Sequence, residues 1–304
     1  MRREPVVLVE KECRSALNPV RGMPFNWSLN PYTGCEHRCT FCYVRAFERR
    51  ADRPADDAYG HTVLVKTNVA GVLRAELSRP SWRRETVAMG SATDPYQPAE
   101  GRYRLSRACL VALHDHRTPA GITTRGPMIV RDVDVLTALA RRAEVMVCIS
   151  VPTLDPVVVA RTEPGTAPPR QRLRALRTLV DAGIRAGVLM APILPGISDG
   201  AAAMAEVVRA ARDSGAAFVA AGPLRLAPGT REHFMEHLAA DWPDLVTEYH
   251  RLFAGRTGLP PSYTTPLQQT VRGLRDTHRV ADRPAPRFIT PAPAPAQLAL
   301  PLAS

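Results

Sequence analysis

Three cysteines lie within eight residues, at Cys35, Cys39 and Cys42, in the spacing C-x3-C-x2-C. Thiolates this close in sequence can bind one metal centre, and soft sulfur donors favour zinc or iron–sulfur over hard cations. Structural zinc usually pairs a C-x2-C knuckle with a second knuckle, which this sequence lacks. Three ligands would instead leave one iron of a cluster open to another donor. A zinc site completed by His37 or Cys148 is the alternative.

The other cysteines are scattered, and Cys109 and Cys148 stand in apolar runs typical of buried small hydrophobes. The charged start, Met1-Arg2-Arg3-Glu4-Pro5, is unlike an apolar signal core, so a secreted disulfide scaffold is not expected. A membrane span needs about 18 or more apolar residues in a row, and the sequence has no such run. We therefore expect a cytoplasmic protein that does not span a membrane.

The 304 residues are 45% hydrophobic and 23% charged, which excludes a collagen, a coiled coil and a wholly disordered chain. The net charge of +11 is compatible with a phosphate-rich partner such as nucleic acid. The only lysines, however, are Lys11 and Lys66, and arginine supplies the rest of the basic charge in an Ala- and Pro-rich chain. The charge therefore indicates composition bias as readily as nucleic-acid binding.

Short apolar runs alternate with amphipathic segments, a pattern that predicts βαβ units and a parallel sheet. Strands are expected at 27–29, 86–89, 121–124, 145–150, 186–193 and 218–224, with helices at 105–114, 131–142, 169–182 and 201–212. These six strand–helix units fit an α/β fold, an incomplete (β/α)6 TIM-type barrel. An open doubly wound sheet is the other candidate, because periodicity alone does not separate the two.

The chain divides into four expected parts. Residues 1–26 form an irregular lead-in, 27–228 the barrel, and 229–281 a C-terminal helical extension. The helix expected over 230–253 is interrupted before Pro243 and packs on the outside. From Pro284 onward six of 21 residues are proline, so 282–304 is expected to be a disordered tail.

The cysteine spacing, with Phe41 just before the third cysteine, resembles the radical S-adenosylmethionine superfamily. Asn30-Pro31-Tyr32-Thr33-Gly34 and Gly90-Ser91-Ala92-Thr93-Asp94-Pro95-Tyr96-Gln97-Pro98 are similar to its spore photoproduct lyase-related group. Tyr43, Thr123-Thr124-Arg125 and the segment 130–136 extend this resemblance, which covers roughly residues 18–255.

The resemblance implies that Cys35, Cys39 and Cys42 hold a 4Fe-4S cluster. The free iron of such a cluster takes S-adenosylmethionine, and reductive cleavage gives a 5′-deoxyadenosyl radical that abstracts hydrogen from a substrate. An electron donor such as flavodoxin or ferredoxin would be needed. In a barrel the site would lie at the carboxyl ends of the strands.

Positions that would bind S-adenosylmethionine follow from the same resemblance. Phe41 would contact the adenine, and Gly90, Ser91 and Thr93 the methionine amino group. Arg125 would meet the methionine carboxylate as a charge-assisted pair.

Three further residues have two interpretations each. Ser150 would contact a ribose hydroxyl, or is a plain strand-end cap. Tyr43 would relay a hydrogen atom near the radical, or packs on the loop. Asp94, in the same rim as Tyr96, would accept a substrate hydrogen bond, or forms an Asx turn before Pro95.

One position departs from the group. Spore photoproduct lyase carries a hydrogen-donating cysteine at the end of the second strand. The matching residue here is Ser91, whose O–H bond is too strong to donate a hydrogen atom to a carbon radical. Repair of the thymine spore lesion is therefore not expected, and the substrate, nucleic-acid related or otherwise, stays unidentified. The alternative function is a non-catalytic nucleic-acid-binding protein stabilised by zinc or an iron–sulfur cluster.

Two weaker motifs remain. His233-Phe234-Met235-Glu236-His237 matches H-x-x-E-H, the inverted zinc-peptidase motif, but no clear third ligand follows it. We interpret it as a solvated helix face away from the strand ends. The tail segment Gln297–Leu302 resembles the Q-L-x-L peptides that bind the bacterial sliding clamp, although Pro301 departs from the usual residue and a random tail is the alternative.

Overall fold

Six parallel strands form the centre of the protein, and the computed structural model describes residues 5–284. The strands are β3 (Trp27–Leu29), β6 (Val87–Met89), β7 (Ala120–Thr124), β8 (Val145–Ser150), β9 (Ala186–Ile193) and β10 (Val219–Pro223). They lie side by side in sequence order, and β2 (Leu17–Pro19) joins β3 antiparallel at one edge. A doubly wound sheet would reverse this order at a switch point. The incomplete (β/α)6 barrel is therefore confirmed and the doubly wound alternative was wrong.

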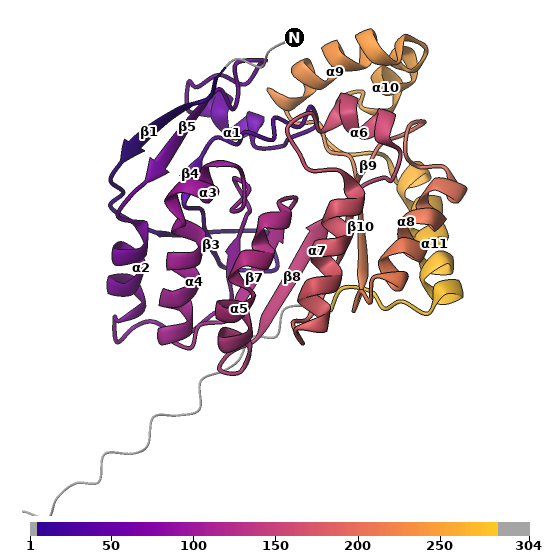
Figure 1. Ribbon diagram of the computed structural model, residues 1–304. Coiled ribbons are helices and arrows are strands. Elements are labelled where there is room, and N and C mark those ends of the chain that lie inside the picture. The colour runs from indigo at the N-terminus through magenta and orange to yellow at the C-terminus, as the bar shows by residue number, and fades with distance from the viewer. Residues whose placement is uncertain (1–4, 285–304) are drawn as a thin grey trace, which may run out of the picture.

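Helices follow the strands and cover the outside of the sheet (Figure 1). They are α2 (Val69–Leu77), α3 (Ala99–Tyr103), α4 (Leu105–Asp115), α5 (Val133–Ala140), α7 (Pro169–Asp181), α8 (Ala201–Asp213) and α11 (Pro261–His278). The helix expected over 131–142 is divided, because a 3-10 turn, η1 (Pro127–Asp132), precedes α5.

Strand β8 shows why the sequences of the central strands are unbroken apolar runs. All six of its residues are buried. Val145, Val147 and Ile149 pack in the main core, whereas Met146 and Cys148 pack on Phe218 of the neighbouring segment. Successive side chains point to opposite faces of a sheet, so a strand covered on both faces needs apolar residues at every position. Cys109 and Cys148 are both buried, as the apolar runs predicted.

The lead-in differs from its expected irregular structure. Strand β1 (Val7–Lys11) pairs in parallel with β5 (Thr62–Lys66), which pairs antiparallel with β4 (Tyr32–Thr33). This small second sheet was missed because the two halves of its parallel pair are far apart in the sequence. Since β4 ends directly before Gly34 and Cys35, the small sheet fixes the start of the cysteine segment.

The helices above the strand ends also differ from expectation. α1 (Arg45–Arg50), α6 (Pro156–Thr162), α9 (Thr230–Asp241) and α10 (Val246–Leu252) lie at the top of Figure 1, the end to which β8 runs. The interruption before Pro243 is present, as the 3-10 turn η2 (Pro243–Leu245). The expected outward packing was wrong, because Phe234 and Leu238 of α9 pack in one cluster with Cys39 and Phe41.

The expected clamp-binding peptide, Gln297–Leu302, and most of the proline-rich tail lie outside the described residues. Within residues 5–284, no helix has the length and apolar character that a membrane crossing requires.

A buried carboxylate, Glu100 of α3, joins the barrel to strand β4 of the small sheet. Its oxygens accept hydrogen bonds from the Tyr32 hydroxyl at 2.5 Å, the Ser106 amide at 2.9 Å and the Arg131 guanidinium at 2.7 Å. Glu100 and Tyr32 are almost completely buried. Loss of the charge would leave several buried donors poorly satisfied.

We therefore predict that Glu100→Gln lowers the free energy of unfolding by about 1–3 kcal/mol. Chemical denaturation followed by circular dichroism measures this loss. Glu248→Gln is the control, because Glu248 pairs with Arg251 on the surface, where an ion pair stabilises little. Equal stability of the two variants would contradict the prediction.

Candidate metal and cofactor site

The cysteine loop runs over residues 34–44, between β4 and α1. Cys35 and Cys39 are buried and Cys42 is half-buried. Two turns shape the loop, in which the amide of Arg38 donates to the carbonyl of Cys35 and the amide of Cys42 to that of Cys39. Gly34 begins it with φ +84°, and a Cβ there would lie 2.7 Å from the carbonyl oxygen of Thr62. Only glycine fits this close approach to β5.

The three cysteines line one cavity with the carboxyl ends of β6 and β7. Residues expected from the sequence that line it are Cys35, Cys39, Cys42, Tyr43, Gly90, Ser91, Thr93, Asp94 and Arg125. His37, Tyr59 and Thr124 also line it. The structure thus brings together, from three separate segments, most of the residues to which the sequence assigned a role.

The cysteine sulfurs are not gathered as closely as the donors of a single zinc ion. Ligands of a tetrahedral zinc with Zn–S bonds of ~2.3 Å lie about 3.8 Å apart. In the described part of the chain, the only three His, Cys, Asp or Glu ligand atoms all within 4.8 Å of one another belong to other residues, considered below. At least one pair of the three cysteine sulfurs is therefore more than 4.8 Å apart, farther than neighbouring donors of one zinc ion.

The two proposed fourth zinc ligands lie in different places, since His37 lines the cavity and Cys148 does not. Nδ1 of His37 lies 3.3 Å from Oδ2 of Asp94. Cys148 packs with Met146 and Phe218, and does not line the cavity. Burial raises the pKa of the Cys39 and Cys42 thiols. Since thiolates are the metal-binding form, filling the site would release protons.

Asp94 connects the loop that follows β6 to the end of β7. Its carboxylate accepts from the Tyr96 amide at 2.8 Å, which is the Asx turn, from the Thr124 hydroxyl at 2.5 Å and from the Arg125 amide at 2.7 Å. Burial acts to raise its pKa, but the positive charge of His37 and these bonds outweigh burial and lower it to about 2. Asp94 is thus an ionised positioning residue with its oxygens already engaged by protein donors.

Arg125 lies at the end of β7 against the cysteine loop. Its Nε donates to Oε1 of Glu163 at 2.5 Å and its Nη2 to the carbonyl of Ala191 at 3.3 Å. The guanidinium also lies 5.6 Å from the centre of the Phe41 ring. Within residues 5–284 its Nη1 has no hydrogen-bond partner. One nitrogen therefore remains to bind an anion in the cavity.

Polar residues at the end of β6 form the opposite wall. The Thr93 hydroxyl donates to the Gly34 carbonyl at 2.6 Å, so β6 is tied to the cysteine loop. Gly90 has φ +93°, and a Cβ there would lie 2.1 Å from the Thr123 carbonyl oxygen of β7. The Tyr43 hydroxyl donates to the Ser91 carbonyl, and Tyr43 is 49% exposed at the rim.

Three expected site residues do not line the cavity. Tyr96 is buried and its hydroxyl donates to Asp132 at 3.1 Å, so it anchors η1. Phe41 is buried in the hydrophobic cluster beneath α9. Ser150 ends β8 as expected, and its buried hydroxyl has no hydrogen-bond partner in the described structure.

Other residues of the site were not identified from the sequence. Glu163 is fully buried between Arg125 and Arg172, and the amide of Gln97 bonds both Thr93 and the Gly34 carbonyl. Gln97 lies in the segment 90–98 that carries the resemblance, but no role was assigned to it. No local pattern marks Glu163, because its partners come from distant segments. His37 was visible inside the cysteine motif, but only as a candidate zinc ligand.

A parallel-stranded incomplete barrel with three cysteines at its strand ends defines a class of metal-cluster proteins. The family model of the radical SAM superfamily matches residues 29–208, and the chain belongs to that superfamily.

The chain is also similar to two uncharacterized relatives and to one solved structure. An uncharacterized protein of Mycobacterium tuberculosis (strain H37Rv) is 39% identical over 293 residues, which cover 95% of this chain and 86% of the relative. An uncharacterized protein of Methanocaldococcus jannaschii is 23% identical over 194 residues, covering 64% of this chain and 70% of the relative. A spore photoproduct lyase mutant with bound AdoMet and dinucleoside spore photoproduct has a TM-score of 0.67 at 14% identity, covering 89% of this chain and 79% of that one. At this identity the last likeness shows the fold.

We predict that Asp94→Asn lowers the free energy of unfolding by about 3–5 kcal/mol, because it leaves the buried His37 without its carboxylate. Asp134→Asn is the matched control. Asp134 pairs with Arg107 on the surface, where its side chain is 65% exposed, and its loss should cost less than about 1 kcal/mol. Denaturant titration of both variants measures the difference, and similar losses would argue against a buried ion pair.

Proposed function

We propose that the protein is a radical S-adenosylmethionine enzyme that holds a 4Fe-4S cluster through Cys35, Cys39 and Cys42. The observation that carries the proposal is the single cavity shared by these cysteines and the ends of β6 and β7. When bound, the cluster and S-adenosylmethionine supply a 5′-deoxyadenosyl radical that abstracts hydrogen from a substrate. The protein residues orient the cofactor and shield it from water.

The cavity offers unsatisfied polar groups suited to S-adenosylmethionine. Nη1 of Arg125 can bind the methionine carboxylate while Glu163 and Ala191 hold the other nitrogens in place. The Ser150 hydroxyl is also buried without a hydrogen-bond partner, but it lies at the end of β8 outside the cavity lining. Gly90 and Ser91 line the cavity where the methionine amino group is expected.

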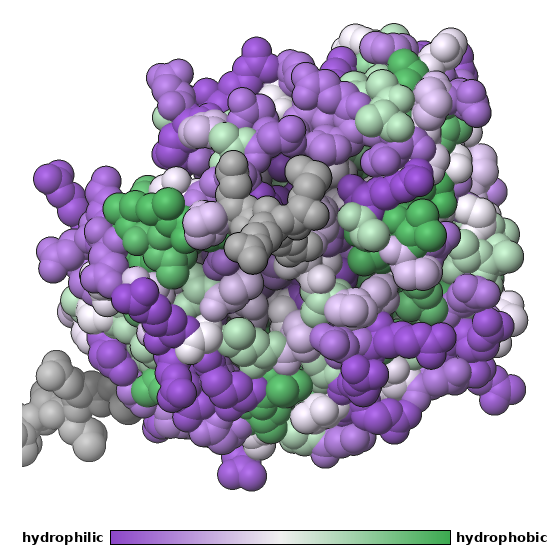
Figure 2. Space-filling model, turned by 45° about the horizontal axis from the view of Figure 1, so that its top comes forward, coloured by the Kyte–Doolittle hydropathy of each residue, from purple (hydrophilic) through white to green (hydrophobic). Residues whose placement is uncertain are grey.

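The substrate differs from that of spore photoproduct lyase. Ser91 stands where that enzyme has its hydrogen-donating cysteine, and the described cysteines outside the loop do not line the cavity. A nucleic-acid-related substrate is compatible with the net charge of +11. On the face that turns forward in Figure 2, hydrophilic residues lie among apolar patches. Flavodoxin or ferredoxin would supply electrons in a reducing cytoplasm, where the six free cysteines stay reduced. Binding to the sliding clamp through Gln297–Leu302 is a further proposal, based on that peptide alone.

Anaerobic reconstitution with iron and sulfide, followed by reduction with S-adenosylmethionine, tests the enzyme class. We predict about four irons per chain and formation of 5′-deoxyadenosine. Cys39→Ala should abolish both, because the cluster loses one ligand. Cys13→Ala is the control, since Cys13 lies outside the loop and does not line the cavity.

Stoichiometric zinc without iron uptake would leave the fold intact and refute the radical chemistry. The same result with nucleic acid bound would instead support the non-catalytic alternative, which produces no 5′-deoxyadenosine.

The role of Arg125 is tested by Arg125→Lys, which keeps the charge but loses the planar fork. A charge-assisted hydrogen bond contributes ~1.5–3 kcal/mol, so the Kd for S-adenosylmethionine should rise about tenfold or more. Iron content should not change. Arg161→Lys is the control, because Arg161 pairs with Asp241 outside the cavity. Equal affinity of the two variants, measured by equilibrium binding, would remove Arg125 from the cofactor site.

A further inference from the structure

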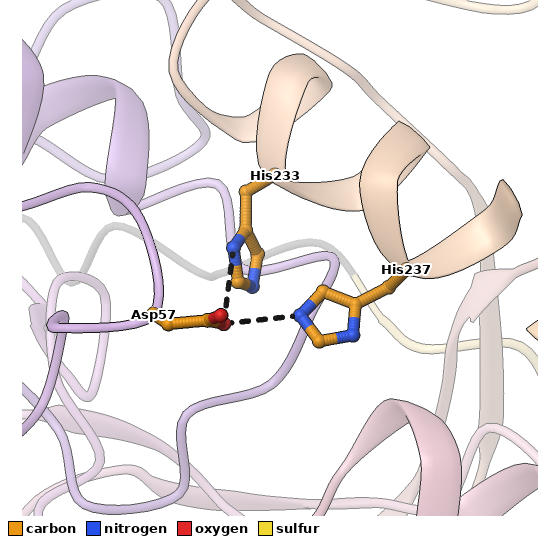
Figure 3. A group of neighbouring side chains, drawn as sticks. All are labelled: Asp57, His233 and His237. Carbon is orange, nitrogen blue, oxygen red and sulfur yellow. Dashed lines mark hydrogen bonds and ion pairs between the residues drawn. The ribbon is translucent and has the colours of Figure 1, made fainter. Parts of the chain in front are cut away.

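Three side chains from distant segments meet beside α9. Asp57 lies in the loop between α1 and β5, and His233 and His237 lie one turn apart on α9, pointing toward Asp57 (Figure 3). Oδ1 of Asp57 is 3.2 Å from Nε2 of His237 and 3.7 Å from Nδ1 of His233. In residues 5–284 this is the only group of three such side chains whose ligand atoms all lie within 4.8 Å of one another.

These separations match the donors of one metal ion. Metal–nitrogen and metal–oxygen bonds of 2.0–2.2 Å in a tetrahedral site put neighbouring donors about 3.3–3.6 Å apart. The two measured distances to Asp57 lie on either side of this range. An ion could therefore bind with small side-chain rotations and no movement of α9.

His233 gives an independent indication of a missing ligand. The residue is only 4% exposed, yet neither of its ring nitrogens has a hydrogen-bond partner in the described structure. Buried polar atoms in proteins are nearly always satisfied, so an imidazole buried without partners requires an explanation. Burial and the nearby charges of Arg45 and His237 lower its pKa to about 4. The ring is therefore neutral at neutral pH, which is the form that binds metals.

Packed elements hold both halves of the group in place. The buried Arg45 donates from Nη1 to the carbonyls of Ala55 at 2.9 Å and Asp56 at 2.5 Å, and so fixes the loop that carries Asp57. At the start of α9, the Thr230 hydroxyl donates to the carbonyl of Cys42 at 3.1 Å. The donors are thus largely preorganised, which reduces the entropy cost of binding an ion.

The outer side of the group is open to solvent. The side chain of Asp57 is 85% exposed and that of His237 is 36% exposed, whereas His233 lies beneath them. An ion could reach the group from solvent, and water could complete its coordination.

We propose that Asp57, His233 and His237 form a second metal site, separate from the cysteine loop, that binds a zinc-like divalent transition metal. Two imidazoles and one carboxylate are donors that zinc accepts, with a fourth position left to water. The group contains no thiolate, so an iron–sulfur cluster is not a candidate. The site does not depend on the radical chemistry proposed above.

Zinc and iron contents of the reconstituted protein test the proposal. We expect about one zinc ion per chain in addition to the cluster iron. His237→Ala and Asp57→Asn change exposed side chains, so both variants should fold. Loss of an outer-shell partner weakens metal binding by ~10–100-fold, so loss of a direct ligand should raise the Kd for zinc by at least that factor. Competition with a chromogenic chelator measures this change. Iron content should stay unchanged in both.

Glu236→Gln is the matched control, because Glu236 lies in the same motif but is exposed and outside the group. It should retain wild-type zinc affinity. Cobalt(II) provides a second measurement, since ligation by nitrogen and oxygen gives visible bands without the near-ultraviolet band of a cobalt–thiolate bond. Unchanged zinc affinity in His237→Ala and Asp57→Asn would overturn the proposal. A cobalt–thiolate band in the near ultraviolet, in place of the spectrum of nitrogen and oxygen ligation, would overturn it as well. Absence of iron or of 5′-deoxyadenosine would bear only on the cysteine site.

Discussion

One buried carboxylate links three strand ends at the cysteine cavity. Glu163 accepts from Arg125, which follows β7 and also bonds the Ala191 carbonyl of β9. It accepts as well from Arg172, whose guanidinium bonds the carbonyl of Ser150 at the end of β8. Glu163 and Arg172 are almost completely buried, whereas the Arg125 side chain is 19% exposed. Removal of the Glu163 carboxylate would leave both arginines without their acidic partner. The position of Arg125, and with it one wall of the cavity, depends on this network.

The barrel and the cysteine loop were predictable because their signals are local. A strand buried on both faces needs a continuous apolar run, and three loop ligands need close spacing, so β8, β9 and the C-x3-C-x2-C loop are visible in sequence. β1 was not predictable, because an exposed five-residue strand depends on its partner β5. Glu163 was missed for the same reason, since its partners come from β7 and α7. Asp94 was identified, but the sequence could not decide between a turn and a substrate contact; the structure provides three protein donors to its carboxylate.

The H-x-x-E-H segment illustrates the limit of motif reasoning. Its helical spacing correctly placed His233 and His237 on one side of a helix, but no clear third ligand follows them in the sequence. The nearby carboxylate is Asp57, far upstream, in a loop held by Arg45. The expected solvated face was wrong for His233, which is buried because α9 packs over the strand ends. Only tertiary structure brings such a group together.

The two candidate metal sites share one loop. Tyr59 lies with its hydroxyl 3.8 Å from Sγ of Cys42, and Asp57, two residues earlier, contacts α9. The Arg45 guanidinium lies over the Tyr59 ring, 4.6 Å from its centre. The hydrogen bonds from Arg45 to the carbonyls of Ala55 and Asp56 already hold this loop, so an ion at Asp57 would meet an ordered segment. Because neither site has to order the loop for the other, loss of zinc should leave the cluster iron in place. The two candidate sites share a rigid loop but no ligand.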